Sequence, residues 1–163
     1  MPDELTTVFL DRDGTINVKA PEGDYVKSWE EFEFLPGAAE AVRALREPGR
    51  RVVIVTNQRG IALGRMSEDD LADIHTRMLE VTGPVDAIYH CPHDDGECDC
   101  RKPRPGMLLR AAAEIPGVDL ANATMIGDSD SDVEAGRAVG ANTIRIGADA
   151  GSLAEAVRWL LAS

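Results

Sequence analysis

Two groups of carboxylates follow apolar stretches of the chain and are the residues best suited to chemistry. Asp11 and Asp13 come directly after the first apolar run, and the segment 127–132, GDSDSD, follows a later one. In open parallel sheets the functional crevice lies beyond the carboxyl ends of the strands, so both groups would face the same crevice. Carboxylates crowded together without enough cations are either partly protonated or hold a hard divalent ion. Magnesium fits best, because it prefers oxygen ligands and bridges to substrate phosphate oxygens.

Each group also has a purely structural explanation. Asp-Gly-Thr is a common turn sequence, and mixed Asp and Ser residues are common at the start of a solvated helix. Asp-x-Asp alone does not separate these explanations from a catalytic one. The presence of both groups at predicted strand ends favours the functional explanation.

Polar donors and cations are predicted at the same edge of the sheet. Thr56 and Asn57 follow the second apolar run, where their side chains suit hydrogen bonding to phosphate oxygens. Arg101 and Lys102 stand just before a helix that Pro105 opens, and cations beside a helix N-terminus favour anion binding. Taken singly, these are ordinary turn residues and a solvated basic turn. Together with the carboxylates they predict a phosphate site.

Three cysteines and a histidine are concentrated in one polar loop. They supply three thiolates and one imidazole, the number and kind of ligands that a closed tetrahedral zinc site requires: Cys91, His93, Cys98 and Cys100. Cysteines so few and so close together do not suit a disulfide framework. The spacing is shorter than the C-x-x-C knuckle of zinc fingers, so free thiols in a reactive loop are the alternative. His90 competes with His93 as the nitrogen ligand, and His75 is interpreted as an incidental surface or core residue.

The elements that must position these residues alternate regularly. Apolar, β-branched runs are followed by helical patterns along the chain, which is typical of βα repeats and a mainly parallel sheet. The expected strands cover residues 6–10, 52–55, 85–89, 124–126 and 143–146. The expected helices lie between Pro36 and Gly49, after a cap at Ser67, from Pro105 to Gly117, before Gly140 and over 153–161. Ser152 and Glu155 predict a capping box for the last helix.

The length of the chain limits its architecture. Its 163 residues suffice for one α/β domain but not for a second folded one. We therefore expect residues 1–163 to form a single domain, a Rossmann-like three-layer α/β/α parallel sheet without a large cap domain. Two intervals break the alternation: residues 14–35, which hold most of the aromatic side chains and predict a short flap over the sheet end, and residues 90–104, the cysteine-rich loop.

The charge balance of the chain is strongly acidic. Lys and Arg number 17 against 29 Asp and Glu, a net charge of −12 that repels polyanions and anionic membrane surfaces. No apolar stretch approaches the ~20 residues that span a bilayer, and the first residues are acidic where a signal peptide needs a basic start. We therefore expect a cytoplasmic protein whose partner is a small phosphorylated substrate, not nucleic acid or a membrane. A monomer is the expected state.

The motifs, taken in order, resemble those of the haloacid dehalogenase superfamily of phosphatases. The segment Asp11–Thr15 matches the family's D-x-D-G-T motif, Thr56 its second motif and Lys102 its third. Asp128-x-x-x-Asp132 matches the fourth. The resemblance implies the fold of that superfamily and covers most of the expected domain.

A narrower resemblance concerns the substrate. Residues 11–17, 56–61, 91–93 and 98–103 resemble the D-glycero-D-manno-heptose 1,7-bisphosphate phosphatases, and the bacterial histidinol-phosphate phosphatases are similar at nearly the same motifs. Residues 104–109 favour the heptose branch. Two features depart from the best-known heptose enzymes: the loop between His93 and Cys98 is shorter, and Ser129 stands where they commonly carry a lysine.

The resemblance implies a magnesium-dependent phosphatase that works through an aspartyl-phosphate. Asp11 would be the nucleophile, and Asp13 the general acid and base, with a proton affinity raised by neighbouring acids. Magnesium would be bound by the carboxylates of Asp11 and Asp128 and the backbone carbonyl of Asp13, with Asp132 acting through a water. The substrate and its phosphate would be held by Thr56, Asn57, Arg101 and Lys102. Both similar groups bind zinc in the cysteine loop, which implies a structural zinc ion here.

The resemblance makes heptose 1,7-bisphosphate the leading substrate, with loss of its 7-phosphate. Histidinol phosphate or another small phosphate monoester is the alternative. Candidates for binding a second anion are Arg59, Arg65, Arg101 and Arg104, with Arg101 preferred. Three other classes fit less well: a polynucleotide 3′-phosphatase because of the net charge, a non-catalytic zinc module because Asp11 and Asp13 are intact, and a phosphotransferase because no cap excludes water.

Overall fold

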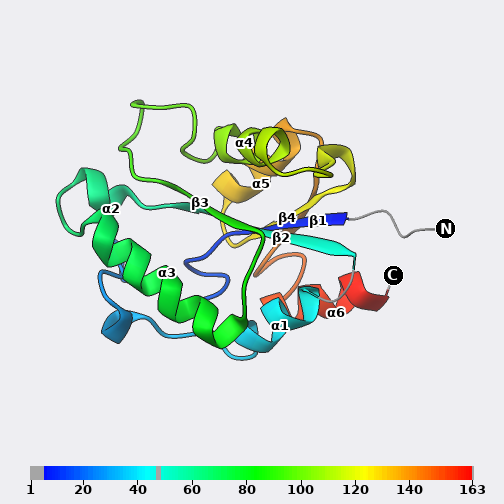
Figure 1. Ribbon diagram of the computed structural model, residues 1–163, viewed down its shortest axis with the longest axis horizontal. Coiled ribbons are helices and arrows are strands. Elements are labelled where there is room, and N and C mark those ends of the chain that lie inside the picture. Colours follow the sequence, from blue (N-terminus) through cyan, green and yellow to red (C-terminus); the bar gives the residue numbers. More distant parts are fainter. Residues whose placement is uncertain (1–5, 47–48, 163) are drawn as a thin grey trace.

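A central parallel sheet organises the protein (Figure 1). The structure is a computed structural model and describes residues 6–46 and 49–162. Its strands are β1 (Thr6–Leu10), β2 (Arg50–Asn57), β3 (Ala87–Cys91), β4 (Thr124–Gly127) and β5 (Asn142–Arg145). They lie in the order β3-β2-β1-β4-β5, and each neighbouring pair is parallel. The winding therefore reverses at β1, which places the functional crevice beside its carboxyl end.

Helices cover both faces of this sheet, which confirms the predicted three layers. On one face lie α1 (Ala38–Leu45), α3 (Glu68–Thr82) and α6 (Leu153–Ala162), and on the other α4 (Gly106–Glu114) and α5 (Asp130–Ala138) (Figure 1). Short elements complete the described chain: α2 (Arg59–Ala62) and the 3-10 turns η1 (Trp29–Glu31) and η2 (Leu120–Asn122). The single turn α2 was not predicted. Among the described residues, no helix is long and apolar enough to cross a membrane.

Side chains that alternate along the strands pack into two separate hydrophobic cores, one on each face of the sheet. On β1, Val8 and Leu10 pack in the core beneath α1, α3 and α6, whereas Phe9 packs in the core beneath α4 and α5. All three side chains are buried, and burial of each contributes about 1.5–3 kcal/mol to folding. Apolar surface on both faces is what a strand covered by two helical layers requires.

The observed ends of the elements follow local hydrogen bonds. Ser67 caps α3 in a reciprocal capping box with Asp70, at the predicted cap. At α6 the expected box is only half formed, because Ser152 Oγ accepts from the Glu155 backbone N–H while the Glu155 carboxylate accepts from Gly151 N. β3 begins two residues later than predicted and ends at Cys91, which pairs with the final residue of the long strand β2.

The flap between β1 and α1 has a buried base and an exposed tip. At the base, Trp29 stacks on Phe32 and both contact Phe34 edge to face, with ring centroids 5.0–6.3 Å apart. Phe32 is buried in the same core as α3, so the base belongs to the core and does not merely lie over the sheet end as predicted. The tip, residues 19–26, lines a cavity at the carboxyl ends of the strands. No large cap domain is present in the part of the chain that the structure describes.

Candidate functional site

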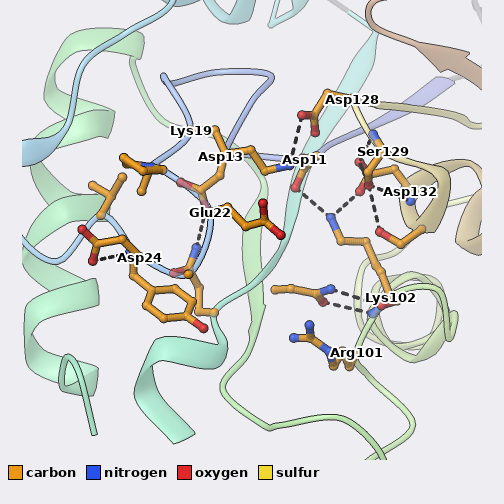
Figure 2. Close-up of a pocket in the computed structure, with 18 residues that line it drawn as sticks. Asp11, Asp13, Lys19, Glu22, Asp24, Arg101, Lys102, Asp128, Ser129 and Asp132 are labelled. Atoms are coloured by element: carbon orange, nitrogen blue, oxygen red, sulfur yellow. Dashed lines mark hydrogen bonds and ion pairs between the residues drawn. The ribbon is translucent and has the colours of Figure 1, made fainter. Parts of the chain in front are cut away.

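A cavity of about 370 Å³ opens at the carboxyl ends of β1, β2 and β4 (Figure 2). Its walls come from the loop after β1, the tip of the flap, the end of β2, the segment before α4 and the start of α5. The sequence-predicted site residues that line it are Asp11, Asp13, Asn57, Arg101, Lys102, Asp128 and Asp132. Thr56 is buried behind this surface and does not line the cavity.

Lys102 is a buried ammonium between two carboxylates. Its Nζ donates to Asp11 Oδ1 at 2.8 Å and to Asp132 Oδ1 at 2.6 Å (Figure 2). It also donates to the Val55 carbonyl at 2.9 Å. Three acceptors satisfy its three N–H groups, which allows the residue to be only 4% exposed. Burial alone would lower the pKa of Lys102, but the charges of Asp11 and Asp132 outweigh it and raise that pKa. The side chain is therefore a fixed positive charge beside Asp11.

Asn57 holds Lys102 in place through the backbone. Its Oδ1 accepts from Lys102 N at 3.0 Å, and its Nδ2 donates to Lys102 O at 3.2 Å. The prediction had this amide bonding directly to phosphate, but both of its polar atoms are engaged with the chain. Asn57 thus joins the end of β2 to the segment that follows the cysteine loop.

Asp11 lies at the end of β1 in a buried, negatively charged environment. Burial raises its pKa well above the usual range, Lys102 opposes this rise, and the charges of Asp132 and Asp128 add to it. Asp11 is 7% exposed, and the exposed part faces the cavity. Its carboxylate therefore stays charged only with cationic support.

Asp13 is held by three donors. Arg12 Nη2 and Asn17 Nδ2 donate to Oδ1 at 2.8 and 2.9 Å, and Gln58 Nε2 donates to Oδ2 at 2.9 Å. Burial raises the pKa of Asp13, but the charge of Arg12 and these hydrogen bonds outweigh it, so the pKa is lowered. The expectation that neighbouring acids raise the proton affinity of Asp13 is wrong for this structure, because its closest partners are donors.

The residues at this end of the sheet fit a magnesium ion. Carboxylate oxygens of Asp11, Asp128 and Asp132 all lie within 4.8 Å of one another. Asp128 Oδ1 is buried and accepts no hydrogen bond from any residue that the structure describes, so one ligand atom is left free for an ion. Gly14 permits this arrangement, since a Cβ there would lie 2.1 Å from Asp128 Oδ2. Hard oxygen donors of this kind are what magnesium prefers.

Asp132 also has a structural role at the start of α5. It is 1% exposed, and its Oδ2 accepts from the backbone N and the Oγ of Ser129 at 3.1 and 2.8 Å, which completes a capping box. Its Oδ1 accepts from Lys102. Both oxygens are therefore engaged, which leaves Asp11 and Asp128 as the better-placed direct ligands.

The cysteine loop gathers its four predicted ligands into one cluster. The Sγ atoms of Cys91, Cys98 and Cys100 lie 2.9–3.4 Å from one another, and His93 Nδ1 lies 3.3 Å from Cys100 Sγ and 3.5 Å from Cys91 Sγ. Three sulfurs and one nitrogen arranged around a common centre fit the closed tetrahedral site of structural zinc. His90 is turned away, with its Nε2 2.7 Å from Glu68 Oε2.

The arginines predicted to bind a second anion are mostly engaged elsewhere. Arg59 pairs with Asp94 at 2.6 Å, and Arg104 Nη1 donates to the Cys98 carbonyl at 2.7 Å. Of the four candidates only Arg101 lines the cavity, and its Nε pairs with Asp95 at 2.7 Å while its Nη1 is buried without a partner among the described residues.

Lys19 is a cavity residue that the sequence did not indicate. It lies in the tip of the flap, its side chain is 60% exposed, and its Nζ is 3.4 Å from Asp128 Oδ2 (Figure 2). The tip has no regular secondary structure, so no periodic pattern marks which of its residues face the cavity. Lys19 and Arg101 together supply two cations with surface left for an anionic ligand.

The chain is similar to a known protein family over most of its length. A model of the family described as haloacid dehalogenase-like hydrolase matches residues 3–140. A Vibrio cholerae protein named D-glycero-beta-D-manno-heptose-1,7-bisphosphate 7-phosphatase is 42% identical over 148 residues, covering 83% of this chain and 77% of that protein. A Mycobacterium tuberculosis protein named D-glycero-alpha-D-manno-heptose-1,7-bisphosphate 7-phosphatase is 41% identical over 160 residues, covering 91% of this chain and 84% of that protein.

The fold is similar to that of a solved phosphatase structure. The crystal structure of the D,D-heptose 1,7-bisphosphate phosphatase from B. bronchiseptica, complexed with magnesium and phosphate, superposes with a TM-score of 0.84. Its sequence is 33% identical, and the match covers 96% of this chain and 98% of that one. The two chains therefore share their fold over almost their whole length.

Proposed function

Because the chain belongs to the haloacid dehalogenase-like hydrolase family, we propose that it is a magnesium-dependent phosphatase that removes the 7-phosphate of D-glycero-D-manno-heptose 1,7-bisphosphate. The observation that best supports this reaction is the position of the Asp11 carboxylate. It faces the cavity beside the ammonium of Lys102 and the free oxygen of Asp128. The names of the relatives and the magnesium and phosphate in the B. bronchiseptica structure support the substrate and the cofactor.

In this mechanism Asp11 is the nucleophile. Its carboxylate attacks phosphorus, the bond from phosphorus to the sugar oxygen breaks, and an aspartyl-phosphate forms. Magnesium held by Asp11 and Asp128, with the Asp13 carbonyl as the predicted third protein ligand, would neutralise the repulsion between the nucleophile and the phosphate. Lys102 stabilises the charge on the phosphate oxygens, with Asn57 fixing its backbone.

Asp13 moves the protons in both halves of the reaction. It gives a proton to the leaving sugar oxygen, then takes one from the water that hydrolyses the aspartyl-phosphate. The charged carboxylate, favoured by Arg12, Asn17 and Gln58, suits the second half. The first half requires a protonated carboxyl, and the arriving phosphate favours it because a nearby negative charge raises the pKa of Asp13.

The second phosphate of the substrate is matched by cations at the rim of the cavity. Arg101 reaches the cavity from the cysteine loop and Lys19 from the flap, and both retain donors for an anion. Since the described chain has no large cap domain, these two segments determine selectivity. A bisphosphate brings a second anion for these two segments to bind, which a monophosphate at Asp11 lacks.

The substrate assignment is tested by comparing kcat/KM for heptose 1,7-bisphosphate and for histidinol phosphate in magnesium. We expect the bisphosphate to be preferred by more than about tenfold, because its second phosphate gives the rim cations a further anion to bind. Both anomers are measured, since the names of the relatives divide between them. Equal or better turnover of histidinol phosphate would exclude the proposed substrate and leave the phosphatase chemistry in place.

Zinc content should depend on His93 and not on His90. In protein purified without chelators we expect about one zinc per chain, falling below about 0.3 in His93→Gln, because a closed site loses a quarter of its ligands. His90→Gln is the matched control, since this neighbouring imidazole is bonded to Glu68 outside the cluster. Metal analysis gives the readout, and a zinc-free wild-type protein or equal loss in both variants would disprove the assignment.

A further inference from the structure

Arg12 is the largest side chain that is fully buried in the described structure. It lies between the two carboxylates of the first motif and has 0% exposure. Its Nη2 donates to Asp13 Oδ1 at 2.8 Å, and its guanidinium lies over the Phe32 ring, 5.7 Å from the centroid. Its Nε has no partner among the described residues. A buried cation with so few hydrogen bonds depends strongly on each of them.

The remaining hydrogen bond of Arg12 goes to His75. Arg12 Nη1 lies 3.1 Å from His75 Nε2. Because a guanidinium only donates, the imidazole must accept at Nε2 and carry its hydrogen on Nδ1. Burial, reinforced by the positive charge of Arg12, lowers the pKa of His75 to about 3, so the ring is neutral at physiological pH. His75 is thus a neutral acceptor and not an incidental residue.

The helix α3 brings His75 to this position. Leu71, Ile74 and Met78 are buried on the face of α3 that packs against the sheet, and His75 is buried with them. The fold of α3 therefore fixes the imidazole from the side opposite the cavity. On the cavity side, Asp13 is 24% exposed and accepts from Arg12.

We propose that His75 is a positioning residue that, by accepting a hydrogen bond from Arg12, holds Asp13 in the orientation needed for proton transfer to the leaving group. The inference rests on the proposed function, in which Asp13 handles that proton. Without the acceptor, Nη1 joins Nε as an unpaired donor in apolar surroundings, and the guanidinium turns toward any other acceptor. Since Asp13 Oδ1 is bonded to this guanidinium, the carboxylate moves with it.

The role of His75 predicts an effect confined to poor leaving groups. Lys102, proposed to stabilise the phosphate, and Asn57, which holds its backbone, make no hydrogen bond to Arg12 or His75 among those described, so phosphate binding should be spared. An alkyl ester such as the heptose bisphosphate needs a proton on its leaving oxygen, whereas 2,4-dinitrophenyl phosphate does not. A general loss of structure would impair both esters equally.

The experiment measures kcat/KM on both esters for His75→Leu, which removes the acceptor, and His75→Gln, which retains one. For His75→Leu we expect a loss of about 30-fold on the alkyl ester and less than about threefold on the aryl ester. His75→Gln should stay within about threefold of wild type on both. Ile74→Val is the matched control, because it disturbs the same buried turn of α3 without a polar contact, and it should change neither.

Several outcomes would overturn the proposal. Equal losses on the two esters, full activity of His75→Leu on the alkyl ester, or a folded His75→Gln that behaves like His75→Leu would each do so. If His75→Leu does not fold, ¹⁵N NMR of the wild-type imidazole decides, with hydrogen on Nδ1 expected and hydrogen on Nε2 contradicting it. A wild-type protein that cleaves the aryl ester but not the bisphosphate would count against the substrate, and the NMR test of His75 would stand independently.

Discussion

Replacement of Asp11 by asparagine is expected to abolish turnover while leaving the fold intact. An amide cannot form the aspartyl-phosphate, so kcat should fall at least about a thousandfold. The fold should survive because the change removes a buried negative charge that lies close to Asp128 and Asp132. Lys102 keeps two of its acceptors, Asp132 Oδ1 and the Val55 carbonyl.

Phosphate release and thermal unfolding measure the two halves of this prediction for Asp11→Asn. The melting temperature should equal or exceed that of the wild type, since burial already disfavours the charged form of Asp11. Asp130→Asn is a suitable control, because Asp130 is exposed and pairs with Arg145 outside the cavity. Its activity should stay within about twofold of wild type. Turnover by Asp11→Asn above a tenth of the wild-type rate would show that Asp11 is not the nucleophile.

Lys102→Met should cost both activity and stability. Removal of one partner from a buried ion pair typically destabilises a protein by about 3–5 kcal/mol, because the remaining charges stay buried without compensation. Here two carboxylates, Asp11 and Asp132, lose their shared cation. The activity should fall at least about a hundredfold, since the charge on the phosphate oxygens also loses its partner.

The loss of stability in Lys102→Met should depend on pH. Without the ammonium, the pKa of Asp11, already raised by burial, rises further above its value in the unfolded chain. The folded state then binds more protons than the unfolded state, so the free energy of unfolding falls as the pH rises and recovers as the pH falls from about 8 toward about 5.

Urea unfolding at several pH values tests this dependence. Lys27→Met is the control, because Lys27 pairs with Asp24 at the surface of the flap and lies outside the buried pair. It should reproduce the wild-type pH profile. A Lys102→Met profile parallel to that of the wild type would contradict the proposed electrostatic role of the ammonium.

The fold was largely predictable from the sequence. Each of the five predicted strands overlaps an observed one, because a strand buried on both faces is a continuous apolar run. The turn α2 carries no such signal, since four residues are too few to show helical periodicity. In the capping box predicted for α6, the hydrogen bond from the Ser152 backbone N–H to Glu155 does not form, because the Glu155 carboxylate accepts from the neighbouring N–H of Gly151.

The sequence predicted the positions of those site residues that directly follow a strand. Parallel strands bring Asp11 and Asp128 to one edge whatever the details of the loops, whereas Lys102 reaches that edge through the segment that Asn57 holds. The surroundings of Asp13 were not predictable, because Gln58 reaches it through a tertiary contact and the side chain of the adjacent Arg12 turns toward it in a way that no local pattern encodes. His75 was missed for the same reason: a histidine among apolar helix residues does not reveal its partner. The catalytic roles of these residues stay predictions until the variants are measured.

The two-part flap has a consequence for how this scaffold diversifies. Its aromatic base is anchored in the main core by Phe32, whereas its tip contributes Lys19 and its neighbours to the cavity wall. Changes of charge or length in the tip can therefore alter which substrate binds. They leave the packing of the aromatic base in the core unchanged. Within one short segment, the tip can vary to bind a different substrate while the base stays fixed in the core.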